Sequence, residues 1–118
     1  MSSVDDELAR GRDLTSPAWT GLELHDVPPR PLPEEVGALA GFGLASRELA
    51  LRANVYVFDS WNGGGEVGER LRQAVDGGPY RALSAVNGAL LLFAIAETDD
   101  PAVERLLRRF VGKFHGIE

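Results

Sequence analysis

The segment from Tyr80 to Glu97, YRALSAVNGALLLFAIAE, constrains the fold more than any other part of this chain. Two apolar runs flank Asn87-Gly88, a dipeptide that suits the two positive φ angles of a type I′ turn. The segment therefore predicts a tight β-hairpin in which Val86 faces Ala89. Both faces of its second strand are apolar, which is typical of a strand in the centre of a sheet.

The rest of the chain predicts further strands and helices. Alternating apolar residues predict a long strand from Ser46 to Phe58, with one buried and one more polar face. Apolar residues at helical spacing predict helices over Glu66–Val75 and from Pro101 to Phe114, the second capped by Asp100. Weaker patterns predict a first strand over Trp19–Val27 and a short helix between Pro33 and Gly41. Residues 1–18 are expected to form a polar, partly helical arm.

These elements predict one α+β domain over residues 1–118, built on a single antiparallel or mixed sheet with helices on one face. Residues 46–114 follow the order strand, helix, hairpin, helix, which resembles a ferredoxin-like split βαββα core. The N-terminal strand is expected to complete that core. The order of elements also resembles secretion-chaperone-like α+β dimers, which end in a helix, a hairpin and a helix.

Charge and composition exclude several classes of function. The 118 residues carry a net charge of −6 and include no cysteine, so disulfides and cysteine-ligated metal sites are excluded. A negative chain disfavours nucleic acid as a partner. The only basic cluster (Arg105, Arg108, Arg109 and Lys113) falls on the expected last helix, where we interpret it as a solvated face. With no apolar run long enough for a membrane and no signal-peptide pattern, we expect a soluble cytoplasmic protein.

A small-molecule site is one hypothesis for the polar face of the long strand. The candidate ligand-binding residues lie on that face and in the loop after it: Arg52, Asn54, Tyr56, Asp59, Trp61 and Asn62. Asn87 is expected near the end of that strand, and His25 is a further candidate for a pocket. An exposed tryptophan between polar residues is typical of loops that anchor ligands or partners. If the face is open, these residues are ordinary cross-strand partners instead.

The segment Gly63 to Gly68, GGGEVG, matches the pattern G-x-G-x-x-G before a predicted helix. Glycines at Gly63, Gly65 and Gly68 would let backbone amides approach a phosphate at the helix N-terminus. The segment is separated from the preceding strand by four residues, unlike the tight turn of dinucleotide-binding folds. We therefore interpret it as a flexible loop ahead of a helix, with phosphate binding as the alternative.

No catalytic constellation and no metal-ligand spacing is present, so we expect no cofactor and lean against an enzyme. The sequence predicts a small binding or interaction protein that self-associates or binds another protein. Leu83, Leu90 and Leu92 are the expected interface, because one layer of helices leaves an apolar sheet face uncovered. The alternative for these leucines is that they lie beneath the N-terminal segment. The alternatives are a cofactor-independent enzyme or ligand carrier of the dimeric ferredoxin-like type, and a phosphate or nucleotide binder.

Overall fold

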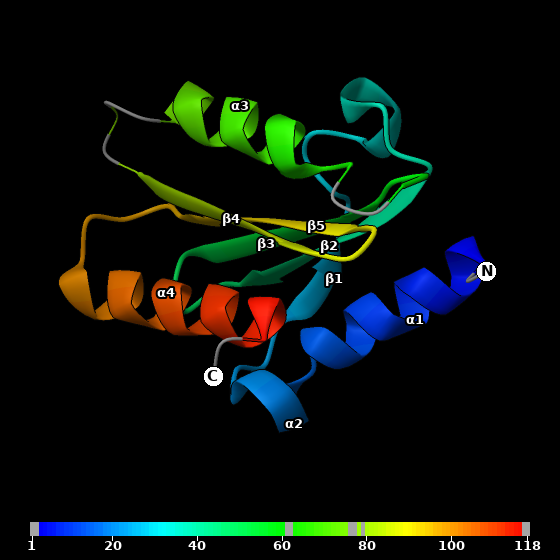
Figure 1. Ribbon diagram of the computed structural model, residues 1–118. Helices are drawn as coiled ribbons and strands as arrows, with labels where there is room; N and C mark the ends of the chain where they lie inside the picture. The colour runs from blue at the N-terminus through cyan, green and yellow to red at the C-terminus, as the bar shows by residue number, and fades with distance from the viewer. Residues whose placement is uncertain (1–2, 61–62, 76–77, 79, 117–118) are drawn as a thin grey trace.

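The computed structural model describes residues 3–60, 63–75, 78 and 80–116, and it is an α+β fold with one antiparallel sheet (Figure 1). In chain order the elements are α1 (Val4–Leu14), α2 (Pro17–Thr20), β1 (His25–Val27), the 3₁₀ helix η1 (Pro33–Val36), β2 (Ala40–Ser46), β3 (Leu51–Val57), α3 (Gly65–Val75), β4 (Arg81–Asn87), β5 (Leu90–Ala96) and α4 (Pro101–His115). The strand order is β1-β2-β3-β5-β4. Strands β1 and β4 therefore form the two edges of the sheet. None of the described helices is long and apolar enough to span a membrane.

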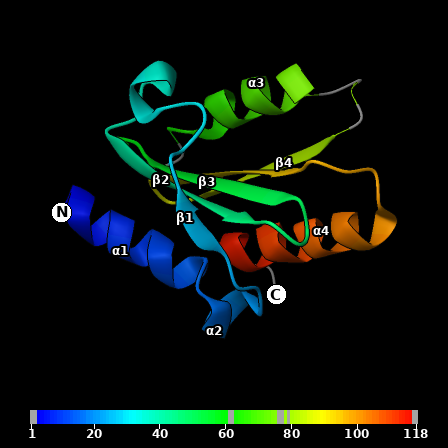
Figure 2. The same ribbon diagram turned by 180° about the vertical axis from the view of Figure 1, so that it is seen from behind.

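Helices cover both faces of the sheet, so the prediction that they cover one face is wrong (Figures 1 and 2). On one face, α1 and α4 pack over a large core that includes Val55, Leu92 and Phe110. On the other face, α3 and η1 pack over a smaller core around Tyr56 and Phe93. The physical reason is that both faces of β5 are apolar, so each face of the sheet needs its own cover.

The hairpin forms as predicted in its strands but not in its turn. Asn87 pairs with Leu90, so the two loop residues are Gly88 and Ala89, and Gly88 has a φ of 62°. Glycine at the first loop position suits a type II′ turn. The predicted pairing of Val86 with Ala89 is therefore wrong. The shift moves the partner of each residue by two positions, so every side chain keeps its predicted face, because strand side chains alternate with a period of two. β5 is buried on both faces, as predicted.

The long strand predicted from Ser46 to Phe58 is shorter in the structure: residues 47–50 form a turn, and the strand β3 (Leu51–Val57) begins only after it. Ala50 has a φ of 53° in this turn, and β2 precedes it where the sequence predicts the end of a helix. The glycines of β2 mask the strand because glycine has a low strand propensity. They have a packing reason: a Cβ on Gly43 would lie 2.7 Å from the carbonyl oxygen of Val27. The proline-rich connection crosses β2 too closely for a side chain.

The N-terminal third is more helical than predicted. The expected strand over residues 19–27 is reduced to β1, and α2 occupies its beginning. The partial helix expected near the N-terminus is the complete helix α1, whose first turn is capped by Ser3. Gly11 does not interrupt it. A Cβ on Gly11 would lie 3.1 Å from Val55 and 3.3 Å from Phe42, so the glycine lets α1 approach the sheet.

Candidate functional site

The polar stripe of β3 (Arg52, Asn54 and Tyr56) binds the proline-rich segment of the chain itself, residues 28–33. Arg52 Nη2 donates to the carbonyl oxygen of Pro28 at 2.9 Å. The Tyr56 hydroxyl donates to the carbonyl oxygen of Pro31 at 2.6 Å. A proline has a carbonyl but no backbone N–H, so donor side chains are the partners it needs. These residues therefore act as structural anchors, and neither the open face nor the ligand cavity that we considered describes them.

Asn54 occupies the middle of the polar stripe and is completely buried. Its Oδ1 accepts from the backbone amide of Arg30 at 2.9 Å, and its Nδ2 donates to the carbonyl oxygen of Phe93 at 3.2 Å. A buried amide side chain is tolerated when both of its ends are bonded. Asn54 therefore joins the proline-rich segment to the central strand β5.

The Tyr56 hydroxyl is held in its protonated form. Burial raises the pKa of Tyr56 above its ordinary value of 10.0, and the nearby charge of Glu35 raises it further, while Arg52 opposes the shift. A protonated phenol can donate to a carbonyl, whereas a phenolate cannot. The raised pKa thus agrees with the role of Tyr56 as a donor to Pro31.

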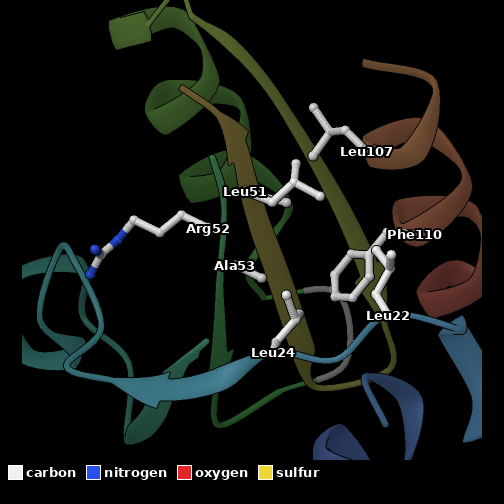
Figure 3. A pocket seen from close by; sticks show the side chains of 8 residues that line it. Leu22, Leu24, Leu51, Arg52, Ala53, Leu107 and Phe110 are labelled. Carbon is white, nitrogen blue, oxygen red and sulfur yellow. The ribbon is translucent and has the colours of Figure 1, made fainter. Parts of the chain in front are cut away.

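A pocket on the opposite face of the sheet is too small to bind a metabolite. It measures about 10 Å³ and is lined by apolar side chains from β3, α4 and the segment before β1, among them Leu24, Ala53 and Phe110 (Figure 3). Such a space is at the lower limit for one water molecule. Figure 3 also shows the guanidinium of Arg52 directed away from these apolar groups. This pocket therefore offers no support for a ligand carrier.

The glycine-rich segment packs against the sheet. A Cβ on Gly64 would lie 2.7 Å from Leu91, and a Cβ on Gly68 would lie 2.8 Å from Leu91 and 3.1 Å from Ser84. Both glycines are buried. Gly63 and Gly65 precede and begin α3. The close approach of α3 to the sheet therefore explains Gly68 without a phosphate, while phosphate binding itself stays a prediction.

The remaining predicted ligand residues are not brought together. Asp59 is exposed at the end of β3, and Trp61 and Asn62 lie outside the described residues. Asn87 joins three segments: its Oδ1 accepts from Arg10 Nη1 at 2.6 Å, and its Nδ2 donates to the carbonyl oxygen of Phe114 at 2.8 Å. His25 is exposed on β1. No group of three or more metal-ligating side chains is found among the described residues.

The three predicted interface leucines have different environments. Leu90 and Leu92 are completely buried in the core beneath α4, so they offer no surface to a partner. The prediction that Leu90 and Leu92 form an interface is therefore wrong, because α1 and α4 cover the sheet face that was expected to be uncovered. Leu83 is only partly buried and lines a groove between β4 and α4. Of the three, Leu83 alone is placed where another chain can contact it.

This groove, which we call the β4–α4 groove, has a volume of about 490 Å³. Its lining residues come from the edge strand and from one side of the last helix: Leu83, Ser84, Ala85, Val86, Arg108, Val111, Gly112 and His115. The helical residues recur at a spacing of three or four, so they form a single stripe along α4. The groove lies beside an edge of the sheet. Figure 1 shows β4 at that edge, with β5 on one side and no strand on the other.

The backbone of β4 presents hydrogen-bonding groups to this edge. The two-residue turn closes on the pair Asn87 and Leu90, whose backbone groups bond to each other. Because this pattern alternates along an antiparallel pair, Ala82, Ser84 and Val86 direct their N–H and C=O groups outward. The carbonyl oxygen of Val86 accepts from His115 Nδ1 at 2.8 Å, which agrees with this assignment. No partner for the outward groups of Ala82 and Ser84 is found within the described part of the chain.

The helix beside the groove is positively charged in a negative protein. Four cations (Arg105, Arg108, Arg109 and Lys113) and one carboxylate, Glu104, give α4 a formal charge of +3, against −6 for the chain. Arg108 lines the groove, and its Nη2 bonds to Glu104 at 3.0 Å. The sequence showed this cluster, but only the fold places one of its members beside an unpaired strand.

Comparison of this chain with protein-family models, with curated proteins and with solved structures finds no match. The candidate site is therefore defined by its own geometry.

Proposed function

We propose that this protein is a non-catalytic interaction protein that binds an extended segment of a partner protein along β4. The observation that carries the proposal is the unpaired edge of a seven-residue strand beside an open groove. A partner segment would extend the sheet by one strand, as in the strand-addition mode of peptide recognition. The backbone would supply affinity and the groove would supply selectivity.

The binding step needs only groups that the edge already presents. Ala82 and Ser84 each offer one N–H and one C=O, so the free part of the edge offers four backbone groups. His115 occupies the carbonyl of Val86 and marks the end of the free edge. Side chains of the incoming segment on the α4 side would contact Leu83 and Val111, which line the groove. Each neutral hydrogen bond would contribute about 1 kcal/mol to association.

Self-association stays a second candidate, and the same edge supports it. Pairing of β4 with β4 of a second copy would bring Leu83 of both copies together, which keeps part of the predicted interface. It would also bring two α4 helices, each with a charge of +3, to the same face of the joined sheet. Because like charges on the same face oppose association, we favour a different partner. The secretion-chaperone-like and ferredoxin-like dimers stay predictions of the same kind.

The ligand-carrier and nucleotide-binding alternatives receive less support from the geometry. Arg52 and Tyr56 are occupied by the proline-rich segment, and Gly68 is occupied by packing against Leu91. Millimolar nucleotide that raised the melting temperature would favour the nucleotide alternative over the one that we propose.

The test uses a labelled seven-residue peptide of alternating threonine and valine, with binding followed by fluorescence anisotropy. The same peptide methylated on the backbone nitrogens of one edge is the first control, because it cannot pair through that edge. We expect the plain peptide to bind and the methylated peptide to bind at least about tenfold more weakly, since two or more hydrogen bonds are lost. Equal binding of the two peptides would overturn the proposal.

Two variants at one position locate the binding. Ser84→Pro removes the outward N–H and leaves the bonds of β4 to β5 in place, because proline is tolerated where a strand N–H faces solvent. Ser84→Ala keeps the backbone donor and is the matched control. We expect Ser84→Pro to abolish peptide binding and Ser84→Ala to preserve it. Binding that survives Ser84→Pro would show that β4 is not the site.

A further inference from the structure

We infer that the partner segment is acidic, with carboxylates on the side chains that face α4. This inference rests on the proposed strand addition at β4 and adds the chemistry of the occupant. The inference rests on the order of three basic side chains along β4 and the groove. Arg81 is exposed at the beginning of β4, Arg108 lines the middle of the groove, and His115 lies at its end beside Val86.

The floor between these groups is apolar and small. Leu83 and Ala85 belong to the face of β4 that packs against the larger core, and Val111 and Gly112 face them from α4. Gly112 has no side chain, so it leaves room above the floor. Because side chains on one face of an extended segment are two residues apart, a segment here would place one side chain on the floor and its neighbours near the ends.

The charges around the groove indicate which flanking side chains the incoming segment carries. Arg108 is exposed, and Glu104 engages only its Nη2 among the contacts of the described residues. An arginine has five N–H donors, so a second carboxylate finds donors beside the first. Arg105 and Arg109, which are also exposed on α4, add to the positive field around the groove. The remainder of the protein is negative and would repel an acidic segment elsewhere, so the same charges also favour this location.

The expected partner is therefore an extended segment in which an apolar side chain is flanked, at alternate positions, by glutamate or aspartate. The same charges disfavour a second copy of β4 as the occupant. Its residues facing α4 are Arg81, Leu83 and Ala85, which include a cation and no carboxylate.

The experiment compares three labelled peptides that share a threonine framework and a central valine. The two positions that flank the valine on the same face carry glutamate in the first peptide, glutamine in the second and lysine in the third. We expect the glutamate peptide to bind about tenfold more tightly than the glutamine peptide, from two partly exposed ion pairs. The lysine peptide should bind most weakly. The difference should shrink in 0.5 M salt, since exposed charges are screened.

A matched pair of protein variants assigns the preference to the groove. Arg108→Gln removes a cation that lines the groove, and Arg70→Gln removes an exposed cation from α3 on the other face of the sheet. Both change the net charge equally. We expect Arg108→Gln to remove most of the preference for glutamate, and Arg70→Gln to leave it unchanged. Equal effects of the two variants would overturn an assignment to this groove.

The outcomes separate this inference from the proposed function. If all three peptides bind equally and Ser84→Pro abolishes binding, strand addition stands and the acidic partner is wrong. If no peptide binds and native mass spectrometry finds a dimer that Ser84→Pro dissociates, the occupant is a second copy and the acidic partner is again wrong. If no peptide binds and Ser84→Pro changes neither mass nor binding, both proposals are wrong.

Discussion

The two edges of the sheet differ in how they are closed. β1 has three residues, Pro28 follows it at once, and its central Asp26 forms an ion pair with Arg12 of α1 at 2.6 Å. A short strand, a charge and a proline are the devices that prevent further pairing of an edge. β4 has seven residues with neither proline nor lysine, and only its first residue, Arg81, is charged.

The two edges therefore differ in whether another chain can pair with them. The β1 edge is continuous with the proline-rich segment that the polar stripe of β3 anchors, so its closure is built from several side chains. The β4 edge lacks the protective devices, although it is the longer strand. An edge of this length without protection is expected to associate with some chain, and the groove beside it makes that association selective.

The largest expected effect tests which groups of β4 point inward. Ala85→Pro removes an N–H that bonds to β5 in the assigned pattern, and we expect it to cost about 3 kcal/mol or more in the free energy of unfolding. Urea denaturation followed by circular dichroism measures this. A loss below about 1 kcal/mol would mean that the alternation along β4 is assigned in reverse.

The second effect concerns the closed edge. Gly43→Ala would place a Cβ 2.7 Å from the carbonyl oxygen of Val27 and 3.0 Å from Pro28. We expect a loss of about 1–3 kcal/mol, because overpacking forces the backbone to move. Gly65→Ala is the matched control: its Cβ would have only Val86 within reach, at 4.0 Å. Amide exchange at Val27 should rise in Gly43→Ala alone; unchanged exchange there would contradict the close crossing.

A third effect links the closed edge to pH. The folded pKa of Tyr56 is raised above its ordinary value of 10.0. The unfolded chain therefore loses this proton first, and stability that is fully present below pH 10 declines as the pH rises above it. Tyr56→Phe should cost about 0.5–1.5 kcal/mol at pH 8 through the lost bond to Pro31, and it should remove this part of the decline. Urea titrations of both proteins at pH 8 and pH 11 check both expectations. An equal fall in the free energy of unfolding between the two pH values would contradict the assignment.

The smallest effect on stability is expected at the open edge. Ser84→Pro should change the free energy of unfolding by no more than about 1 kcal/mol, because it removes no bond of the β4–β5 pair. The same variant is expected to abolish binding of the threonine–valine peptide. Urea denaturation of Ser84→Pro beside Ala85→Pro gives the contrast directly. Similar losses for the two neighbours would remove the distinction between an inward and an outward side.

Local patterns predicted the elements whose faces are strongly apolar. α4 was predicted because Asp100, Pro101 and the apolar spacing all agree, and Asp100 does accept from the amide of Ala102 at 2.9 Å. The faces of β3 and β5 were predicted for the same reason. β2 was missed because its glycines lower strand propensity, and their packing against the proline-rich segment is a tertiary effect that no local pattern contains.

The candidate site was predicted only in fragments. Leu83 and the cations of α4 were singled out, but as members of unrelated features. Their combination depends on β5 lying between β3 and β4, which puts β4 at the edge. That order arises from pairing between residues about forty positions apart, such as Val55 with Leu92. The sequence predicts the polar stripe as a candidate ligand-binding face, but no local pattern indicates that the proline-rich segment is its partner.

The junction at Asn87 has a consequence for the order of folding. Its partners Arg10 and Phe114 are 77 and 27 residues away. The hairpin around Gly88 is local and can form within microseconds. The hydrogen bonds of Asn87 to Arg10 and Phe114 can form only after α1 and the end of α4 have packed beside the hairpin turn. On a ribosome, residue 87 emerges before residue 114. Asn87 is therefore expected to acquire its native bonds among the last steps, and substitutions there should speed unfolding more than they slow folding.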